Sequence, residues 1–181
     1  MIDTNSLINK VKEDRSIIEY ISLFVPKYRG YKEKELRREV DALIRKQLHS
    51  TLHIYIRDLR WIEKELINAD MNTLGSYIES SITQTDIISK KILHAKQGYS
   101  AVWQSIKTGK EELTELIHYD ASLLGKIQEI KEPIAKIREQ IRKKNYDECD
   151  QFIEEYSLFL ISFDGIFNGR EEVILGLANG E

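Results

Sequence analysis

Apolar residues recur at helical spacing through one long stretch of the chain, and this pattern constrains the fold more than any other feature. Between residues 36 and 66 they follow one another three or four positions apart without a break: Leu36, Val40, Ile44, Leu48, Leu52, Tyr55, Leu59, Ile62 and Leu66. Steps of three and four place side chains on one face of an α-helix. The pattern predicts a long helix over about Lys32–Leu66 with one buried face.

Four further stretches show the same periodicity. They predict helices over about Ser6–Phe24, Thr73–Ile106, Thr108 to residue 141, and Asn145 to Gly169, with a short last helix over Arg170–Leu177. Helices joined by short connectors return antiparallel. We therefore expect an all-α fold, an elongated up-and-down antiparallel bundle of about five helices, three of them long. It forms a single domain over residues 1–181, or has residues 147–181 as a C-terminal helical appendage.

Local signals mark where these helices begin, bend and end. Pro26 ends the first helix, and Thr108 with Glu111 has the spacing of a capping box. Pro133 predicts a kink near Glu129, because proline removes one backbone hydrogen bond of the helix. Asn145 is expected to cap the following helix, and Gly169 to interrupt it. The seam hydroxyls of the third helix, on Ser81 and Thr85, are expected to bond back to their own helix.

Composition excludes several classes of protein. Two Pro and nine Gly in 181 residues are too few for a turn-dense β-sandwich. The uncharged run Tyr156–Phe163 is too short to cross a bilayer, which argues against a transmembrane protein. The first residues lack the apolar core of a signal peptide, which argues against secretion. A single Cys allows no internal disulfide. We expect a cytoplasmic protein. A net charge of −3 disfavours nucleic acid as a partner.

Charge is distributed unevenly along the chain. The segment Lys27–Lys46 has eight basic and four acidic residues, whereas from Asp147 to the end nine acidic residues accompany Arg170 alone. Such segments attract each other within a fold or between copies of the chain.

Two stretches, PKYRGYKEKELRREVDALIRKQL (Pro26–Leu48) and GYSAVWQSIKTGKEELTELIHYDASLL (Gly98–Leu124), resemble an uncharacterised family of prokaryotic all-helical proteins. The run YRGYKEKELRREVD and the start of the second stretch, GYSAVWQSIK, carry the resemblance. It implies an all-helical fold and supplies no activity and no catalytic residues.

One polar residue occupies a position where the seam requires an apolar side chain. Asp120 lies between two apolar seam residues of the fourth helix, and a buried carboxylate needs a partner. Antiparallel pairing of successive helices brings it level with Asp41 and Arg45 of the second helix and Tyr99 of the third. Arg45 and Arg38 are the expected partners of Asp120, with the Tyr99 hydroxyl as a further donor. Three interpretations are open. The polar layer fixes the register of the helices, or it forms a ligand site, or Asp120 is exposed to solvent and no layer forms.

Metal and nucleophile signals are weak. His49 and His53 share a helix face, and Glu115 with His118 forms one ExxH motif, but no second such motif is present. Cys149 lies on an apolar face among acidic neighbours, which predicts a buried, unreactive thiol. We assign no metal, no cofactor and no catalytic residue.

These observations favour a non-enzymatic helical-bundle protein, coiled-coil-like in its seams, that serves as an interaction or scaffold module. Apolar residues of the last segment (Phe152, Phe159, Leu160, Phe163, Phe167 and Leu177) are interpreted as a patch that a second copy covers, giving a homodimer. The alternative is a small-molecule or anion-binding protein, or an enzyme, that uses the polar layer of Arg38, Asp41, Arg45, Tyr99 and Asp120.

Overall fold

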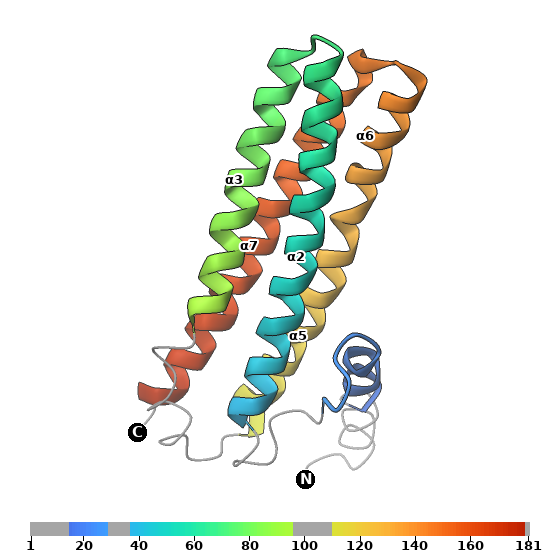
Figure 1. Ribbon diagram of the computed structural model, residues 1–181. Coiled ribbons are helices and arrows are strands. Elements are labelled where there is room, and N and C mark those ends of the chain that lie inside the picture. The colour runs from blue at the N-terminus through green and yellow to red at the C-terminus, as the bar shows by residue number, and fades with distance from the viewer. Residues whose placement is uncertain (1–14, 29–36, 96–109, 180–181) are drawn as a thin grey trace. The chain divides into compact units, whose positions relative to one another are not determined.

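The computed structural model describes residues 15–28, 37–95 and 110–179, and every regular element in these residues is a helix (Figure 1). The elements are a helix over residues 15–24, α2 (Arg37–Asn68), α3 (Asn72–His94), α5 (Lys110–Glu129), α6 (Lys131–Lys143), the short 3₁₀ turn η3 (Tyr146–Glu148) and α7 (Cys149–Asn179). The predicted all-α fold class is confirmed. None of the helices in the described ranges has the length and apolar character needed to cross a membrane.

The predicted apolar seams form the core. On α2, each described member of the seam from Val40 to Leu66 is at most 4% exposed. The seams of α5, α6 and α7 are also buried, at Leu124, Ile127, Ile137 and Tyr156 among others. Burial of these side chains supplies the main driving force for folding, since each large apolar residue removed from water contributes about 1.5–3 kcal/mol.

Contacts between Cα atoms divide the chain into two compact units. Of the described residues, unit 1 contains 15–28, 37–47, 95, 110–124 and 166–179, and unit 2 contains 48–94 and 125–165. In unit 2, parts of α2 and α7 lie side by side with α3 and α6 (Figure 1). The α2 and α6 segments run in one direction, and α3 and α7 run in the other. Unit 2 is therefore an up-and-down four-helix arrangement, as the short connectors predicted.

The break between α5 and α6 lies where Pro133 was expected to produce it. α5 ends at Glu129 and α6 begins at Lys131. Pro133 has no backbone N–H to donate to the carbonyl of Glu129, and the backbone bond at the break itself, from Ile130 N to Lys126 O, is long at 3.3 Å. The predicted kink is confirmed.

Two predicted helix boundaries are wrong. The Asn145 side chain makes no capping bond but donates to the Gln140 side chain at 3.3 Å, and α7 begins only at Cys149, after η3. α7 also continues through Gly169 to Asn179, so that the predicted interruption and separate last helix do not form. The reason lies in packing: a Cβ atom on Gly169 would come within 2.9 Å of the Tyr119 hydroxyl. Gly169 lets a tyrosine approach the helix and does not end it.

The interpretation of the last segment as an exposed aromatic patch is corrected as well. Leu160, Phe163 and Phe167 are at most 1% exposed and belong to the core. The exposed apolar residues near them are Leu158 and Ile161. The predictions for the first helix before residue 15, the third helix beyond residue 95, the capping box and Leu177 fall outside the described residues or side chains.

Candidate functional site

A cluster of charged side chains is buried inside unit 1, and Asp120 is part of it. The Asp120 carboxylate is fully buried on α5. Its Oδ1 accepts a hydrogen bond from Arg170 Nε at 2.7 Å, and its Oδ2 accepts one from the Tyr28 hydroxyl at 2.9 Å. Both bonds are charge-assisted and are therefore stronger than bonds between neutral groups.

Arg170 links this carboxylate to a second one on α2. Its Nη1 lies 3.0 Å from Asp41 Oδ1, and Asp41 Oδ2 accepts from Arg45 Nε at 2.9 Å and lies 2.8 Å from Arg45 Nη2. Both arginines are at most 5% exposed. We call Tyr28, Asp41, Arg45, Asp120 and Arg170 the charged layer. Its two carboxylates and two guanidinium groups balance in charge.

Local structure places each member of the layer. Asp41 and Arg45 are four residues apart on α2 and so lie on one helix face. Tyr28 follows a turn in which Lys27 adopts a left-handed conformation, with φ of 71°. This turn places the Tyr28 side chain in the interior, where it is 4% exposed. Arg170 occupies the seam of α7 between Phe167 and Ile174, both fully buried. The layer therefore draws on four segments of unit 1.

Sequence reasoning found part of this layer. Asp41, Arg45 and Asp120 are brought together as predicted, but the arginine that joins the two carboxylates is Arg170 and not Arg45 or Arg38. Tyr99 and the Arg38 side chain lie outside the described part of the structure. Arg170 was missed because Gly169 was interpreted as a helix end. Continued spacing of four and three residues through Phe163, Phe167 and Ile174 would have placed it on the buried face.

Hydroxyl groups of the α3 seam make the bonds that were predicted for them. Ser81 Oγ donates to Tyr77 O at 3.0 Å, and Thr85 Oγ1 donates to Ser81 O at 2.6 Å. Thr85 Oγ1 also lies 2.6 Å from the Tyr156 hydroxyl of α7. Burial raises the pKa of Tyr156, and the hydrogen bond to Thr85 partly opposes that shift. This buried pair is a second polar contact between helices, within unit 2.

The Tyr55 hydroxyl makes a third such contact. It donates to Ile127 O at 2.9 Å. Burial, with a smaller effect of the Asp58 charge, raises the pKa of Tyr55 to about 12. A tyrosine with this pKa is neutral at physiological pH and serves as a hydrogen-bond donor.

The histidines and the other metal candidates do not form a complete ligand set in the described residues. The rings of His49 and His53 meet edge to face, with centroids 4.4 Å apart, and His49 Nδ1 lies 2.8 Å from Ser89 Oγ of α3. Glu115 and His118 are exposed on α5. No group of three or more His, Cys, Asp or Glu residues able to hold a metal ion occurs in the described ranges.

The sole cysteine has the properties of an unreactive thiol. Cys149 is fully buried at the start of α7. Burial, with a smaller effect of the Glu148 charge, raises its pKa to about 11. Since the thiolate is the reactive form, Cys149 is a poor nucleophile near neutral pH, as the sequence predicted.

Comparison with known proteins supplies no analogy for these residues. No family model, no curated protein and no solved structure matches this chain. The resemblance of the segments Pro26–Leu48 and Gly98–Leu124 to a prokaryotic helical family stays a prediction.

Proposed function

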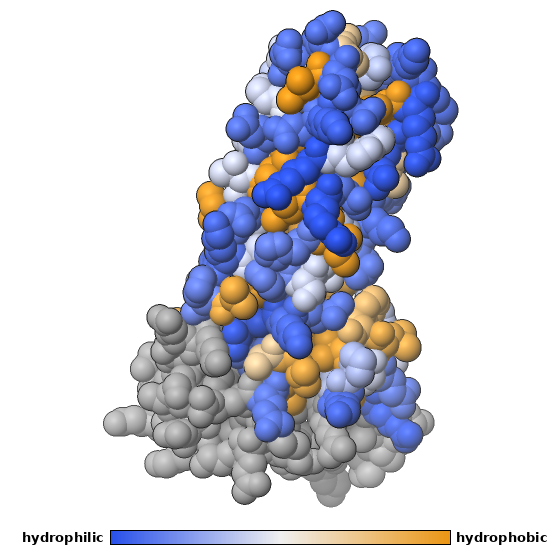
Figure 2. Space-filling model, in the orientation of Figure 1, coloured by the Kyte–Doolittle hydropathy of each residue, from blue (hydrophilic) through white to orange (hydrophobic). Residues whose placement is uncertain are grey.

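We propose that this protein is a non-enzymatic interaction module that associates with a second copy of itself through the outer face of α7. The observation that carries the proposal is the exposure of two large apolar side chains on one turn of that helix. Leu158 is 60% exposed and Ile161 is 67% exposed. We call these two residues the α7 stripe. On the face of unit 2 that Figure 2 shows, apolar residues lie in patches among hydrophilic ones.

The charged layer supports this function over the alternative of a ligand site inside the bundle. Each of its four ionised groups already faces a group of opposite charge, at 2.7 to 3.0 Å. An anion entering the layer would have to displace a buried carboxylate from its arginine, which is costly because the carboxylate would remain desolvated. A register-fixing role requires no ligand, and buried polar groups serve that role in coiled coils.

Charge around the α7 stripe favours a second copy as its occupant. Two of the acids that border the stripe are paired within the chain, since Glu155 lies 3.4 Å from Lys136 of α6 and Asp164 lies 2.7 Å from Lys91 of α3. Between them, the run Tyr156–Phe163 carries no charge. Glu154, four residues before Leu158 on the same face, is exposed and makes no ion pair with a described residue. In an antiparallel pair of α7 helices centred between Leu158 and Ile161, the two Glu154 side chains lie at opposite ends of the contact and do not face each other.

Two-fold symmetry suits the spacing of the stripe. In an antiparallel pair of α7 helices with the axis midway between the two residues, Leu158 packs against the partner's Ile161, and the contact repeats on the other side of the axis. Residues three apart lie on one helix face, so that both side chains reach the interface together.

The test is the mass of the protein in solution as a function of concentration. Sedimentation velocity from about 1 µM to about 500 µM should detect a dimer of the wild-type chain, because this range covers weak and moderate association. The variant Leu158→Glu/Ile161→Glu should remain monomeric with unchanged helix content. Ile87→Glu, at a residue of α3 that is 60% exposed, is the matched control and should still dimerise. A monomeric wild type, or a double variant that still dimerises, refutes the proposal.

Crosslinking locates the interface independently. Because Cys149 is buried and has a raised pKa, a new surface cysteine is the reactive thiol of the chain. Ile161→Cys should form a disulfide-linked dimer on mild oxidation, whereas Ile87→Cys should not. Equal crosslinking at both positions would indicate random collision and contradict the assignment.

A further inference from the structure

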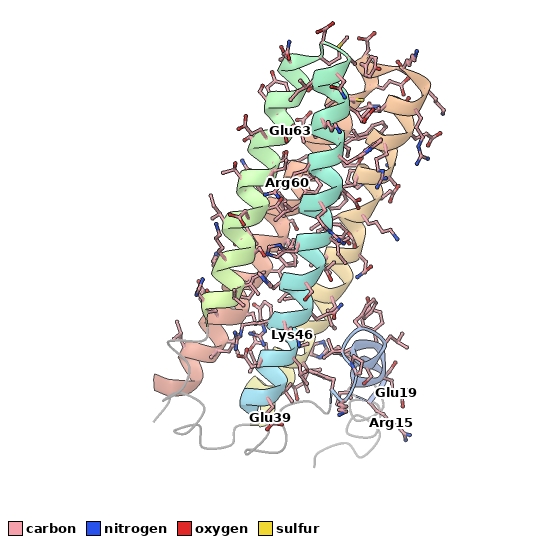
Figure 3. The ribbon with its side chains drawn as sticks, in the orientation of Figure 1. Arg15, Glu19, Glu39, Lys46, Arg60 and Glu63 are labelled. Carbon is pink, nitrogen blue, oxygen red and sulfur yellow. The ribbon has the colours of Figure 1, made fainter. Side chains whose placement is uncertain are left out.

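A groove on unit 2 carries positive charge that the described residues do not neutralise. It has a volume of about 520 Å³ and is lined on the α2 side by His49, His53, Arg57 and Arg60, and on the α3 side by Asp86. Arg60 lies on the side of α2 that faces α3 (Figure 3). The volume is within the usual range of small-molecule sites.

The two arginines of the groove are available to a ligand. Arg57 and Arg60 are exposed, and neither makes an ion pair or a side-chain hydrogen bond with any residue in the described ranges. They are three residues apart on α2 and so point to the same side of the helix. The acid of the opposite wall, Asp86, is already paired with Lys90 on its own helix. The groove therefore presents two guanidinium groups, which suit the oxygens of a phosphate or carboxylate.

The rest of the groove wall is aromatic and apolar. Ser89 of α3 holds the His49 ring through Nδ1, and the His53 ring packs edge to face against it. Ile54, 47% exposed, also lines the groove. A ligand that lies along α2 would thus meet charge at one end and flat or apolar groups at the other.

We propose that this groove binds a small organic phosphate, with the phosphate held by Arg57 and Arg60 and the organic part packed against Ile54 and the two imidazole rings. Phosphate is favoured over a metal ion because two guanidinium groups repel cations. It is favoured over a carboxylate because its three oxygens can accept from both arginines at once. The site is separate from the α7 stripe and does not depend on dimer formation.

The probe for this proposal is phenyl phosphate, which combines the two parts of the expected ligand. The full chain is titrated in low salt, and the Nε–Hε signals of labelled arginine side chains are followed by NMR. Saturable binding with a Kd below about 1 mM is expected. Inorganic phosphate and benzoate should each bind at least about tenfold more weakly, since each lacks one part of the ligand, and phenol should not bind.

Paired variants separate a site from general surface charge. Arg57→Gln/Arg60→Gln should weaken phenyl phosphate binding at least about tenfold, with unchanged helix content because both residues are exposed. Lys131→Gln/Arg142→Gln removes two exposed charges of α6 and should change Kd less than about twofold. Absence of saturable binding, equal loss in both variants, or equal affinity for phenyl phosphate and either inorganic phosphate or benzoate overturns the proposal.

Discussion

Replacing Arg170 by methionine tests the charged layer most directly. Arg170 is fully buried and faces Asp120 at 2.7 Å and Asp41 at 3.0 Å. Methionine preserves much of the volume but removes the charge, so that Asp120 loses its charged partner at 2.7 Å and Asp41 loses one of its two arginines. Removal of one partner from a buried ionic cluster typically costs about 3–5 kcal/mol, because it leaves an uncompensated charge out of water.

Protonation of Asp120 sets an upper limit to that cost and gives it a pH dependence. An aspartate with an ordinary pKa of about 3.9 takes up a proton at pH 7 for about 4 kcal/mol, and at pH 5 for about 1.5 kcal/mol. The free energy of unfolding of Arg170→Met should therefore lie about 3–4 kcal/mol below wild type at pH 7 and about 1.5 kcal/mol below it at pH 5. The difference in free energy of unfolding between wild type and variant becomes smaller towards acid pH, because the variant takes up a proton on folding and the wild type does not.

Urea unfolding followed by circular dichroism at the two pH values measures these differences. The double variant Arg170→Met/Asp120→Leu should recover most of the stability, since it leaves the neutral pair of Asp41 and Arg45. Arg15→Met, which removes an exposed ion pair with Glu19, is the control and should match wild type. A loss below about 1 kcal/mol at pH 7, or a loss independent of pH, would refute the assignment of a buried, internally paired layer.

Three further predictions concern α7, and each is measured by urea unfolding at concentrations too low for self-association. Gly169→Ala should lower the free energy of unfolding by about 1–2 kcal/mol, because the added Cβ atom meets Tyr119. Gly165→Ala should raise it by about 0.5–1 kcal/mol, because no atom lies within 4 Å of the added Cβ and alanine favours the helix. A change of the same sign at both positions would contradict the packing role of Gly169. Tyr156→Phe should cost about 1–2 kcal/mol through loss of its buried bond to the threonine of α3, and an unchanged midpoint would show that the bond contributes nothing. The free energy of unfolding of the wild type should fall between pH 9 and pH 11, because the folded chain retains the Cys149 proton that the unfolded chain loses. Cys149→Ala should make this fall less steep. The same dependence on pH in the variant would exclude the thiol as its cause.

The sequence was sufficient to predict which faces are buried. Spacing of three and four residues identified the seam of α2 and also the polar members of other seams, such as Thr85 and Asp120, because burial follows the helical period whatever the residue type. The bend before α6 was predictable for a similar reason, since proline acts locally through its missing N–H.

The contacts between helices could not be predicted in the same way. Pairing of successive helices suggested Arg45 or Arg38 for Asp120, whereas Arg170 joins α7 to both α2 and α5. Gly169 has a low helix propensity, and only its contact with Tyr119 explains why the helix continues there. The exposed pair on α7 was likewise missed, because periodicity does not reveal how much of a helix surface the neighbouring helices cover.

The charged layer has a consequence for the order in which the chain folds during synthesis. All residues of unit 2 have been synthesised once residue 165 has been added. Asp41 and Asp120, however, pair with Arg170, which is synthesised 129 residues after Asp41 and 50 residues after Asp120. Contacts over such separations form late because closing the intervening loop costs entropy. A chain that stops short of Arg170 holds two carboxylates without their shared counter-ion. We therefore expect unit 1 to fold after unit 2. We also expect unit 1 to be stable only in a chain that includes Arg170.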